Sequence, residues 1–264
     1  MSRSKFREKS VLVTGGAGAI GSRLTRRLLD SGASVVVLDD LSSGYSWNLP
    51  TDPALTVIEG DVADPAVLKR AFRADPSIVF HLAAFFANQQ SVEDPERDLQ
   101  TNGFGILRTL QASAAGESVQ RFVYASSSCV YSGSGQSPSF EETDPLSLEF
   151  HTPYELTKTL GEGYCTYFDE GTALETVRAR IFNSYGPGEV PGRYRNVIPK
   201  FVYLAMNGEP LPITGSGAET RDFTYVGDIV DGLMALGRSA DVAGEAVNLA
   251  TGSETRIDRL AELV

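Results

Sequence analysis

The sequence predicts an α/β protein built around a doubly wound parallel sheet. Short runs of β-branched residues alternate with segments whose apolar residues recur at helical spacing. The first run ends in a glycine-rich turn, and the second ends in an acidic residue. Strands that alternate with helices are joined by right-handed crossovers, which make the strands parallel and place helices on both faces of the sheet.

The glycine-rich turn follows the strand expected at residues 11–14. It reads Gly-Gly-Ala-Gly-Ala-Ile-Gly, and an apolar stripe at Ile20, Leu24 and Leu28 then predicts a helix. Glycines let a backbone approach a pyrophosphate, whose charge faces the helix N-terminus, so this context predicts a dinucleotide site. A plain glycine-rich turn is the alternative. The residues expected at the cofactor are Gly15, Gly18, Ala19, Ile20 and Gly21.

The second strand, expected at residues 34–38, is followed by Asp39. In dinucleotide sites an acidic side chain about 20 residues after the glycine turn binds the adenosine ribose. A carboxylate at this point repels the additional 2′-phosphate of NADP, so Asp39 predicts NAD as the cofactor. A solvated strand end is the alternative interpretation of Asp39.

The remaining elements continue the alternation. Strands are expected at residues 55–59, 77–80, 121–125 and 174–181, and helices at 64–72, 95–115, 153–170, 196–205 and from 257 onward. Asp64 and Pro65 indicate a helix start, because Asp caps free N–H groups and Pro suits the first turn. Asn102 and Gly103 weaken the 95–115 helix locally. Residues 211–213 are expected to form a short extended piece.

Composition and charge restrict the class of function. With 42% hydrophobic and 22% charged residues over 264 positions, the chain has an ordinary globular composition. Its net charge of −11 argues against nucleic acid or an anionic membrane as a partner, although not against a nucleotide. No apolar run reaches the ~18 residues of a membrane span and no signal peptide is recognised, so a cytoplasmic protein is expected. Cys129 and Cys165 lack metal-ligand spacing, and no metal site is expected.

A tyrosine and a lysine are expected on one helix face. Thr152, Pro153 and Glu155 form a capping pattern, so Tyr154 lies in the first turn of a helix and Lys158 one turn later. Free tyrosine titrates near ~10, which is too high for a base at neutral pH. The charges of Lys158 and of an oxidised nicotinamide would favour the phenolate of Tyr154. A surface pair at i, i+4 spacing is the alternative.

Three serines, Ser126, Ser127 and Ser128, follow the fifth strand. Ligands bind outside the carboxyl ends of strands in doubly wound sheets, so these hydroxyls are expected to face the site. A serine-rich turn is the alternative.

These motifs together resemble the extended short-chain dehydrogenase/reductase family, and specifically its NAD-dependent nucleotide-sugar epimerases and dehydratases of the UDP-glucose 4-epimerase type. The matching segments are residues 14–21, Asp39, 60–62, 81–84, Asn102, 126–131, 154–158, 180–187, 215–217 and 221–226. The resemblance implies a Rossmann-type doubly wound parallel sheet with a smaller C-terminal substrate-binding region.

The resemblance also implies a role for individual residues. It implies catalytic roles for Ser127, Tyr154 and Lys158. It implies further cofactor contacts from Asp61, Val62, Ala83, Ala84, Asn102, Tyr154 and Lys158. It implies substrate contacts from Ser127, Ser128, Tyr154, Asn183, Asn196, Val197, Ile213 and Arg221. Arg221 suits a diphosphate because a guanidinium can bind two phosphate oxygens, and an ion pair with Asp222 or Asp228 is the alternative. Arg193 and Arg195 are further candidates.

The expected domain organisation has two parts. Residues 1–180 are expected to form the NAD-binding domain, to which 224–251 return. Residues 181–223 and 252–264 are expected to form the substrate-binding region. Family members continue for several dozen residues past Val264, so this region is expected to be truncated.

The expected function is NAD-dependent 4-epimerisation of a UDP-hexose or UDP-hexuronate through a transient 4-keto sugar, by a homodimer. Related dehydratases carry Asp and Glu, and decarboxylases a Glu, where this chain has Ser128 and Cys129. Neither of these two is a ready proton donor, although a lowered pKa would make Cys129 an unusual acid or base. A 4,6-dehydratase or a decarboxylase is the alternative, and a non-catalytic NAD-binding sensor is a more distant one.

Overall fold

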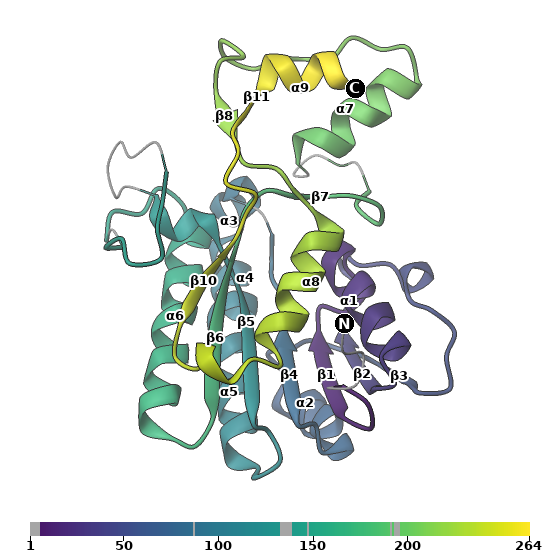
Figure 1. Ribbon diagram of the computed structural model, residues 1–264, viewed down its shortest axis with the longest axis vertical. Helices are drawn as coiled ribbons and strands as arrows, with labels where there is room; N and C mark the ends of the chain where they lie inside the picture. The colour runs from purple at the N-terminus through teal and green to yellow at the C-terminus, as the bar shows by residue number, and fades with distance from the viewer. Residues whose placement is uncertain (1–5, 87, 133–138, 147, 191, 193–195) are drawn as a thin grey trace.

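The computed structural model describes residues 6–86, 88–132, 139–146, 148–190, 192 and 196–264. Its principal strands are β1 (Ser10–Thr14), β2 (Ser34–Asp39), β3 (Leu55–Glu59), β4 (Ile78–His81), β5 (Arg121–Ser127), β6 (Glu175–Ile181) and β10 (Ala246–Leu249). These seven strands form one sheet in the order β10-β6-β5-β4-β1-β2-β3 (Figure 1). Every neighbouring pair is parallel. The predicted doubly wound α/β class is therefore confirmed.

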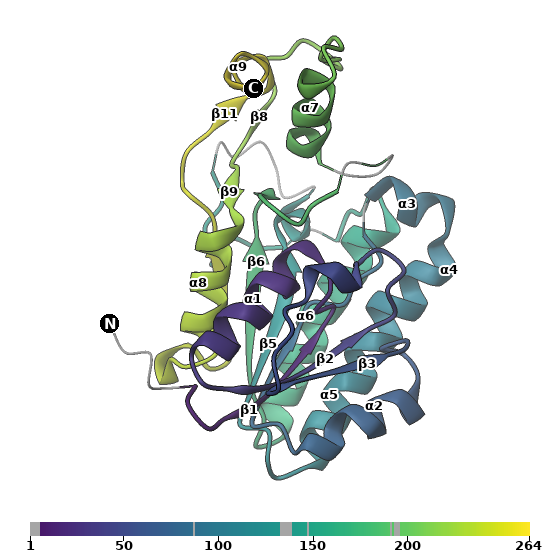
Figure 2. The ribbon, with the colours of Figure 1, turned by 90° about the vertical axis from the view of Figure 1, so that its right-hand side faces the viewer.

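Helices cover both faces of this sheet (Figures 1 and 2). They are α1 (Ala19–Asp30), α2 (Pro65–Ala71), α3 (Asn88–Glu93), α4 (Pro95–Asp98), α5 (Gly105–Ala115), α6 (Pro153–Gly171), α7 (Val197–Met206), α8 (Val226–Leu236) and α9 (Ile257–Leu263). Helices α1 and α8 pack on one face, and α2, α5 and α6 pack on the other. Strand β1 contributes Val11 and Val13 to the first core and Leu12 to the second, because successive strand side chains point to opposite faces. Burial on both faces explains why the strands read as continuous apolar runs.

The helix predicted at 95–115 is present, but its middle is wound differently. Helix α4 continues into a π-helical turn, η3 (Leu99–Phe104), and then into α5. Asp98 and Asn102 both point into the protein interior, where they are buried. The local weakness predicted at Asn102 is thus a change of helix type, which is common near functional sites.

The upper part of the molecule stands above the carboxyl ends of the parallel strands (Figure 1). It contains α7, α9 and two small sheets, in which β7 (Ser184–Tyr185) pairs with β9 (Thr224–Tyr225) and β8 (Thr220–Arg221) pairs with β11 (Thr255–Arg256). Residues 211–213 belong to no strand, because the extended pairing is made by the neighbouring segment β8 instead.

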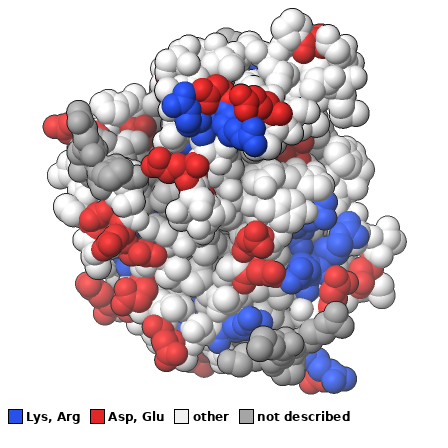
Figure 3. Space-filling model, turned by 45° about the horizontal axis from the view of Figure 1, so that its top comes forward, with Lys and Arg blue, Asp and Glu red and all other residues white. Residues whose placement is uncertain are grey.

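Charged side chains of both signs lie side by side on the top face of the molecule (Figure 3). Helix α9 illustrates this, with ion pairs from Arg256 to Asp258 at 2.5 Å and from Arg259 to Glu262 at 2.7 Å. Exposed pairs of this kind contribute little to stability. None of the helices in the described ranges is long and apolar enough to span a membrane.

Candidate active site

A cavity of about 1280 Å³ opens at the carboxyl ends of the parallel strands. One side of it is lined by the glycine turn, Asp39 and Asp61, and the other by Ser127, Tyr154 and Lys158. This is the edge at which doubly wound sheets bind their ligands. The cofactor and catalytic residues predicted from distant parts of the chain therefore share one cavity, with the exception of Asn102.

The glycine turn packs tightly between β1 and the loop that follows β4. Gly15 has φ +69°, and a Cβ added there would lie 2.6 Å from the backbone nitrogen of Ala83, so only glycine fits. The residue just before helix α1 is Gly18, which has no side chain to cap the free N–H groups of the first turn. Uncapped N–H groups at a helix start are suited to an anionic phosphate.

Asp39, the last residue of β2, is fixed by the turn itself. One carboxylate oxygen accepts the N–H of Ala17 at 2.8 Å, and the other accepts the N–H of Leu41 at 2.9 Å. Burial raises the pKa of Asp39, and these two hydrogen bonds oppose that rise. Turn, helix start and acidic side chain therefore form one preorganised unit whose chemistry fits the phosphates and ribose of a dinucleotide.

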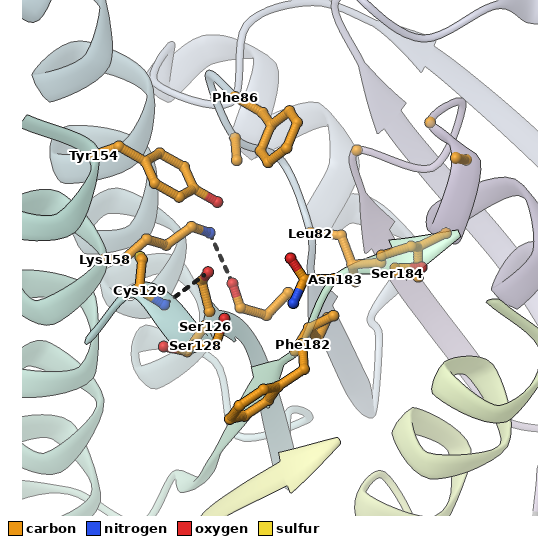
Figure 4. Close-up of a pocket in the computed structure, with 18 of the residues that line it drawn as sticks. Leu82, Phe86, Ser126, Ser128, Cys129, Tyr154, Lys158, Phe182, Asn183 and Ser184 are labelled. Carbon is orange, nitrogen blue, oxygen red and sulfur yellow. Dashed lines mark hydrogen bonds between the residues drawn. The ribbon is translucent and has the colours of Figure 1, made fainter. Parts of the chain in front are cut away.

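Tyr154 and Lys158 project from the first turns of α6 into the same cavity (Figure 4). The helix begins as predicted, with the Thr152 hydroxyl accepting the N–H of Glu155 at 3.3 Å. Tyr154 is 6% exposed and Lys158 is 3% exposed, so the alternative of a surface pair is wrong. Lys158 Nζ donates to the Ala125 carbonyl at 2.7 Å and lies 5.6 Å from the centre of the Tyr154 ring.

Burial controls the ionisation of this pair. It lowers the pKa of Lys158 to about 8, against the opposing effects of Cys129, Asp98 and Glu162. It raises the pKa of Tyr154 well above its usual value, although a hydrogen bond with Ser127 opposes the rise. Cys129 and Asp98 add to this rise. The predicted fall in the pKa of Tyr154 depends on the charge of a bound nicotinamide as well as on Lys158, so it stays a prediction.

The residues that follow β5 carry hydroxyls but no acid. Ser127 Oγ accepts the N–H of Cys129 at 3.3 Å, and the serine side chain also forms a hydrogen bond with Tyr154. Ser128 and Cys129 also line the cavity. Burial raises the pKa of Cys129 to about 12, so the hypothesis that its thiol is an unusual acid or base is wrong. Within the described ranges, no group of His, Cys, Asp and Glu could hold a metal ion.

Arg221 and Asn183 line the cavity from the side of the upper part. The Arg221 guanidinium donates to the Thr220 carbonyl at 2.7 Å and forms no ion pair with any residue that the structure describes. Asp222 instead accepts the N–H groups of Thr251 and Gly252, so the alternative pairing of Arg221 with Asp222 is wrong. Arg221 therefore remains available to an anionic ligand.

Of the other residues predicted to contact the substrate, some line the cavity and others do not. Asn196 lines the cavity, but its side-chain nitrogen donates to the Ser184 carbonyl and to a Glu189 carboxylate oxygen, at 3.3 and 3.0 Å. Val197, the first residue of α7, and Ile213, which is 42% exposed, are not among the lining residues. Arg193 and Arg195 lie outside the described residues.

Asn102 lies behind the cavity wall rather than on its surface. Its side-chain oxygen accepts the N–H of Phe85 at 2.8 Å, and its side-chain nitrogen donates to the Phe85 carbonyl at 3.2 Å. Its amide is thus engaged with the loop after β4, and the contact of Asn102 with the cofactor stays a prediction. That loop places Phe86 in the cavity, with its ring edge-on to Tyr154 at 5.9 Å between ring centres (Figure 4).

A buried ion pair beneath the cavity was not predicted from the sequence. Arg180 Nη2 lies 2.8 Å from Glu162 Oε2, and the Ser126 hydroxyl donates to the same carboxylate at 2.5 Å. Arg180 also donates to the Tyr131 hydroxyl at 2.7 Å. These bonds join α6 to β5 and β6 directly below Ser127. The i, i+4 spacing of Lys158 and Glu162 was the signal that could have indicated a second inward-facing charge on this helix.

The fold and the site together define a dinucleotide-dependent α/β enzyme class with a tyrosine–lysine pair. The chain belongs to the NAD dependent epimerase/dehydratase family, whose model matches residues 11–250. It is 34% identical to a UDP-glucose 4-epimerase of Mycolicibacterium smegmatis over 92% of this chain and 78% of that protein. It is 33% identical to a UDP-N-acetyl-alpha-D-glucosaminuronate decarboxylase of Bacillus cytotoxicus, over 97% and 79% of the two chains.

Solved structures agree with this membership. Epimerase Mth375 of Methanothermobacter thermautotrophicus is 53% identical, with a TM-score of 0.94 over 98% of this chain and 76% of that one. The Bordetella bronchiseptica enzyme WbmF, solved in complex with NAD+, is 37% identical, with a TM-score of 0.88 over 98% and 78%. The predicted family is confirmed, and NAD is confirmed as the cofactor of that family.

Proposed function

We propose that this chain is an NAD-dependent nucleotide-sugar 4-epimerase that acts on a UDP-hexose or a UDP-hexuronate. The observation that carries the proposal is the composition of the cavity around Tyr154. Ser127, Tyr154 and Lys158 converge there, whereas the neighbouring Ser128 and Cys129 offer no group that exchanges a proton near neutral pH. Such a site has the parts for oxidation at C4 but lacks those for elimination.

Each side chain has a distinct part in the proposed reaction. The glycine turn and Asp39 would hold NAD, which would supply the acceptor and later the donor of a hydride. Tyr154 takes the proton from the sugar O4 and returns it, and Ser127 hydrogen-bonds that oxygen. The Lys158 ammonium stabilises the phenolate of Tyr154 and is held in place by the Ala125 carbonyl. The 4-keto sugar turns over and regains the hydride on its other face.

The two parts of the molecule have separate tasks in this proposal. Residues 1–180, with 224–251, hold the cofactor, and residues 181–223 and 252–264 bind the nucleotide diphosphate. Two cavity-lining side chains support this division. They are Arg221, whose guanidinium forms no ion pair among the described residues, and Asn183, whose amide donates to the Asp222 carbonyl at 3.0 Å. Arg221 suits the role because its planar fork can bind two phosphate oxygens at once.

A decarboxylase is the second candidate, because one relative of 33% identity carries that name. The raised pKa of Cys129 argues against it, since a thiol that titrates at about 12 is a poor proton donor. A non-catalytic NAD sensor is disfavoured because it has no use for a buried Tyr154 beside a buried Lys158.

The products formed from a panel of nucleotide sugars test the proposal. The panel comprises UDP-glucose, UDP-glucuronate, UDP-N-acetylglucosamine and dTDP-glucose, with products identified by NMR. We expect a C4 epimer from at least one UDP-sugar. A 4-keto-6-deoxy sugar or a pentose would contradict the epimerase assignment, and the absence of any product together with bound NAD would favour the sensor.

Asp39 is expected to determine the choice of cofactor. The unmodified protein should bind NAD more tightly than NADP, because a buried carboxylate repels the 2′-phosphate. Asp39→Ala should narrow the preference by ~10-fold or more, as expected for the loss of about 1.4 kcal/mol of repulsion. Asp39→Asn is the matched control, since it keeps the side-chain size and removes the charge. Equal affinities in the unmodified protein, measured by calorimetry, would contradict the ribose assignment.

We also propose a homodimer that forms through α6 and the adjacent turn η3. Apolar side chains exposed on these two elements are Leu99, Phe104, Leu156, Leu160 and Tyr167. Leu156→Glu should convert a dimer into a monomer in solution scattering, because it places a charge in an apolar contact. Val202→Glu on α7, a comparably exposed apolar position, should not. A monomeric unmodified protein would exclude this interface.

A further inference from the structure

Asp98, the last residue of α4, is a charged side chain in the protein interior. It is 0% exposed, and it does not line the cavity. A buried carboxylate is costly unless it is hydrogen-bonded and balanced by charge. The partners of Asp98 therefore indicate what the residue does.

Both carboxylate oxygens of Asp98 accept a hydrogen bond, and the two donors lead to two different segments that line the cavity. Oδ1 accepts the hydroxyl of Thr157 at 2.7 Å, and Oδ2 accepts the side-chain amide of Asn102 at 2.7 Å. Thr157 is the neighbour of Lys158 on α6. Asn102 holds the backbone of Phe85, next to the Phe86 ring that packs against Tyr154. The π-helical turn η3 brings Asn102 to this position.

We propose that Asp98 is a positioning residue for the proposed reaction: it ties α6 to the loop after β4 and supplies a fixed negative charge behind Tyr154 and Lys158. The inference rests on the proposed function for its kinetic consequence, but its structural consequence does not. The hydrogen bonds and the charge are separable, because Thr157 carries one of the bonds and Asp98 alone carries the charge.

Several other titratable groups surround Lys158 and act on it together with the charge of Asp98. The other titratable groups that face Lys158 come from four elements: His81 on β4, Tyr124 on β5, Cys129 after β5, and Tyr154, Glu162 and Cys165 on α6. Burial and the Lys158 charge lower the pKa of His81 to about 3, and burial raises the pKa values of Tyr124, Cys129 and Cys165, so these four are neutral near pH 7. Burial raises the pKa of Asp98, and its hydrogen bonds with Thr157 and Asn102 and the charge of Lys158 oppose that rise. Asp98 and Glu162 both favour the charged form of Lys158.

The direction in which Asp98 shifts the neighbouring pKa values follows from its negative charge. A negative group raises the pKa of both neighbours, Lys158 and Tyr154, because it favours their protonated forms. Asp98→Asn removes the charge and keeps the size, so both pKa values should fall. Turnover rises as Tyr154 ionises and falls as Lys158 loses its proton, so both limbs of the pH profile should move to lower pH.

The test compares Asp98→Asn with Thr157→Val, which removes a hydrogen bond but leaves the charge. The direct readout is an NMR titration of ¹³C-labelled lysine, in which Lys158→Met identifies the signal of Lys158 among those of Lys5, Lys9, Lys69 and Lys200. In the unmodified protein that signal should titrate near pH 8. The pH at the midpoint of the Lys158 titration should fall in Asp98→Asn and stay unchanged in Thr157→Val. The pH profile of turnover should shift to lower pH in Asp98→Asn.

An unchanged or raised Lys158 midpoint in Asp98→Asn would overturn the inference, as would an equal fall in Thr157→Val. If Asp98→Asn does not fold, as judged by circular dichroism, the smaller neutral Asp98→Ser replaces it in the same titration. The NMR comparison needs no substrate. A protein that epimerises no nucleotide sugar would therefore contradict the proposed function and leave the test of Asp98 intact.

Discussion

The Tyr154→Phe variant is expected to lose turnover by a factor of at least ~10² while it still binds NAD. The change removes the group that exchanges a proton with the sugar O4. It keeps the ring that packs against Phe86 and lies 5.6 Å from Lys158 Nζ. Cofactor binding is expected to survive because the glycine turn and Asp39 lie on the opposite side of the cavity.

Tyr124→Phe is the matched control for this experiment. Tyr124 is also buried and its ring lies 5.1 Å from Lys158 Nζ, but its hydroxyl has no hydrogen-bond partner among the described residues. Removal of that hydroxyl should leave turnover near the unmodified level. Turnover is measured by NMR with the UDP-sugar that gives the fastest reaction, and bound NAD by release on denaturation. Substantial turnover in Tyr154→Phe would exclude Tyr154 as the base.

Breaking the buried pair of Glu162 and Arg180 is expected to have the largest effect on stability. Glu162→Gln leaves the Arg180 guanidinium buried without its carboxylate, which costs about 3–5 kcal/mol in comparable cases. The glutamine amide keeps one acceptor oxygen, for which the Ser126 hydroxyl and the Arg180 guanidinium then compete, and its NH2 group faces the guanidinium without an acceptor. Urea unfolding followed by circular dichroism measures the change in the free energy of unfolding.

Two further variants test whether the loss of stability comes from an unpaired buried charge. The double variant Glu162→Gln/Arg180→Met should recover part of the loss, since no unpaired charge remains buried. Asp231→Asn breaks the exposed pair of Arg27 and Asp231 and should cost less than ~1 kcal/mol. If Glu162→Gln were no more damaging than Asp231→Asn, the buried pair would have no special importance for the fold.

The features that the sequence predicts correctly are local ones. The glycine turn, Asp39 and the Tyr154–Lys158 face each follow from spacing within one or two elements, and the alternation of elements then determines the sheet. All of them meet at the carboxyl edge, because parallel strands end on the same side.

The features that sequence patterns miss depend on contacts between distant residues. Asp98 meets Thr157 across 59 positions, and Ser126 meets Glu162 across 36. No periodicity indicates which buried polar groups will pair. Asn102 is predicted at the cofactor because its position matches the family, and the π-helical turn directs its amide to the backbone of Phe85. Ile213, predicted at the substrate, lies in a segment without regular structure and is not among the residues that line the cavity.

The fate of the hydrogen at C4 tests the proposed reaction most directly. The UDP-sugar that turns over fastest is prepared with deuterium at C4 and incubated with the protein in ordinary water. Because the hydride leaves C4 and returns to it within one closed site, NMR should show a C4 epimer that retains deuterium at C4. Deuterium lost to solvent, or found at another carbon of the product, would contradict the mechanism.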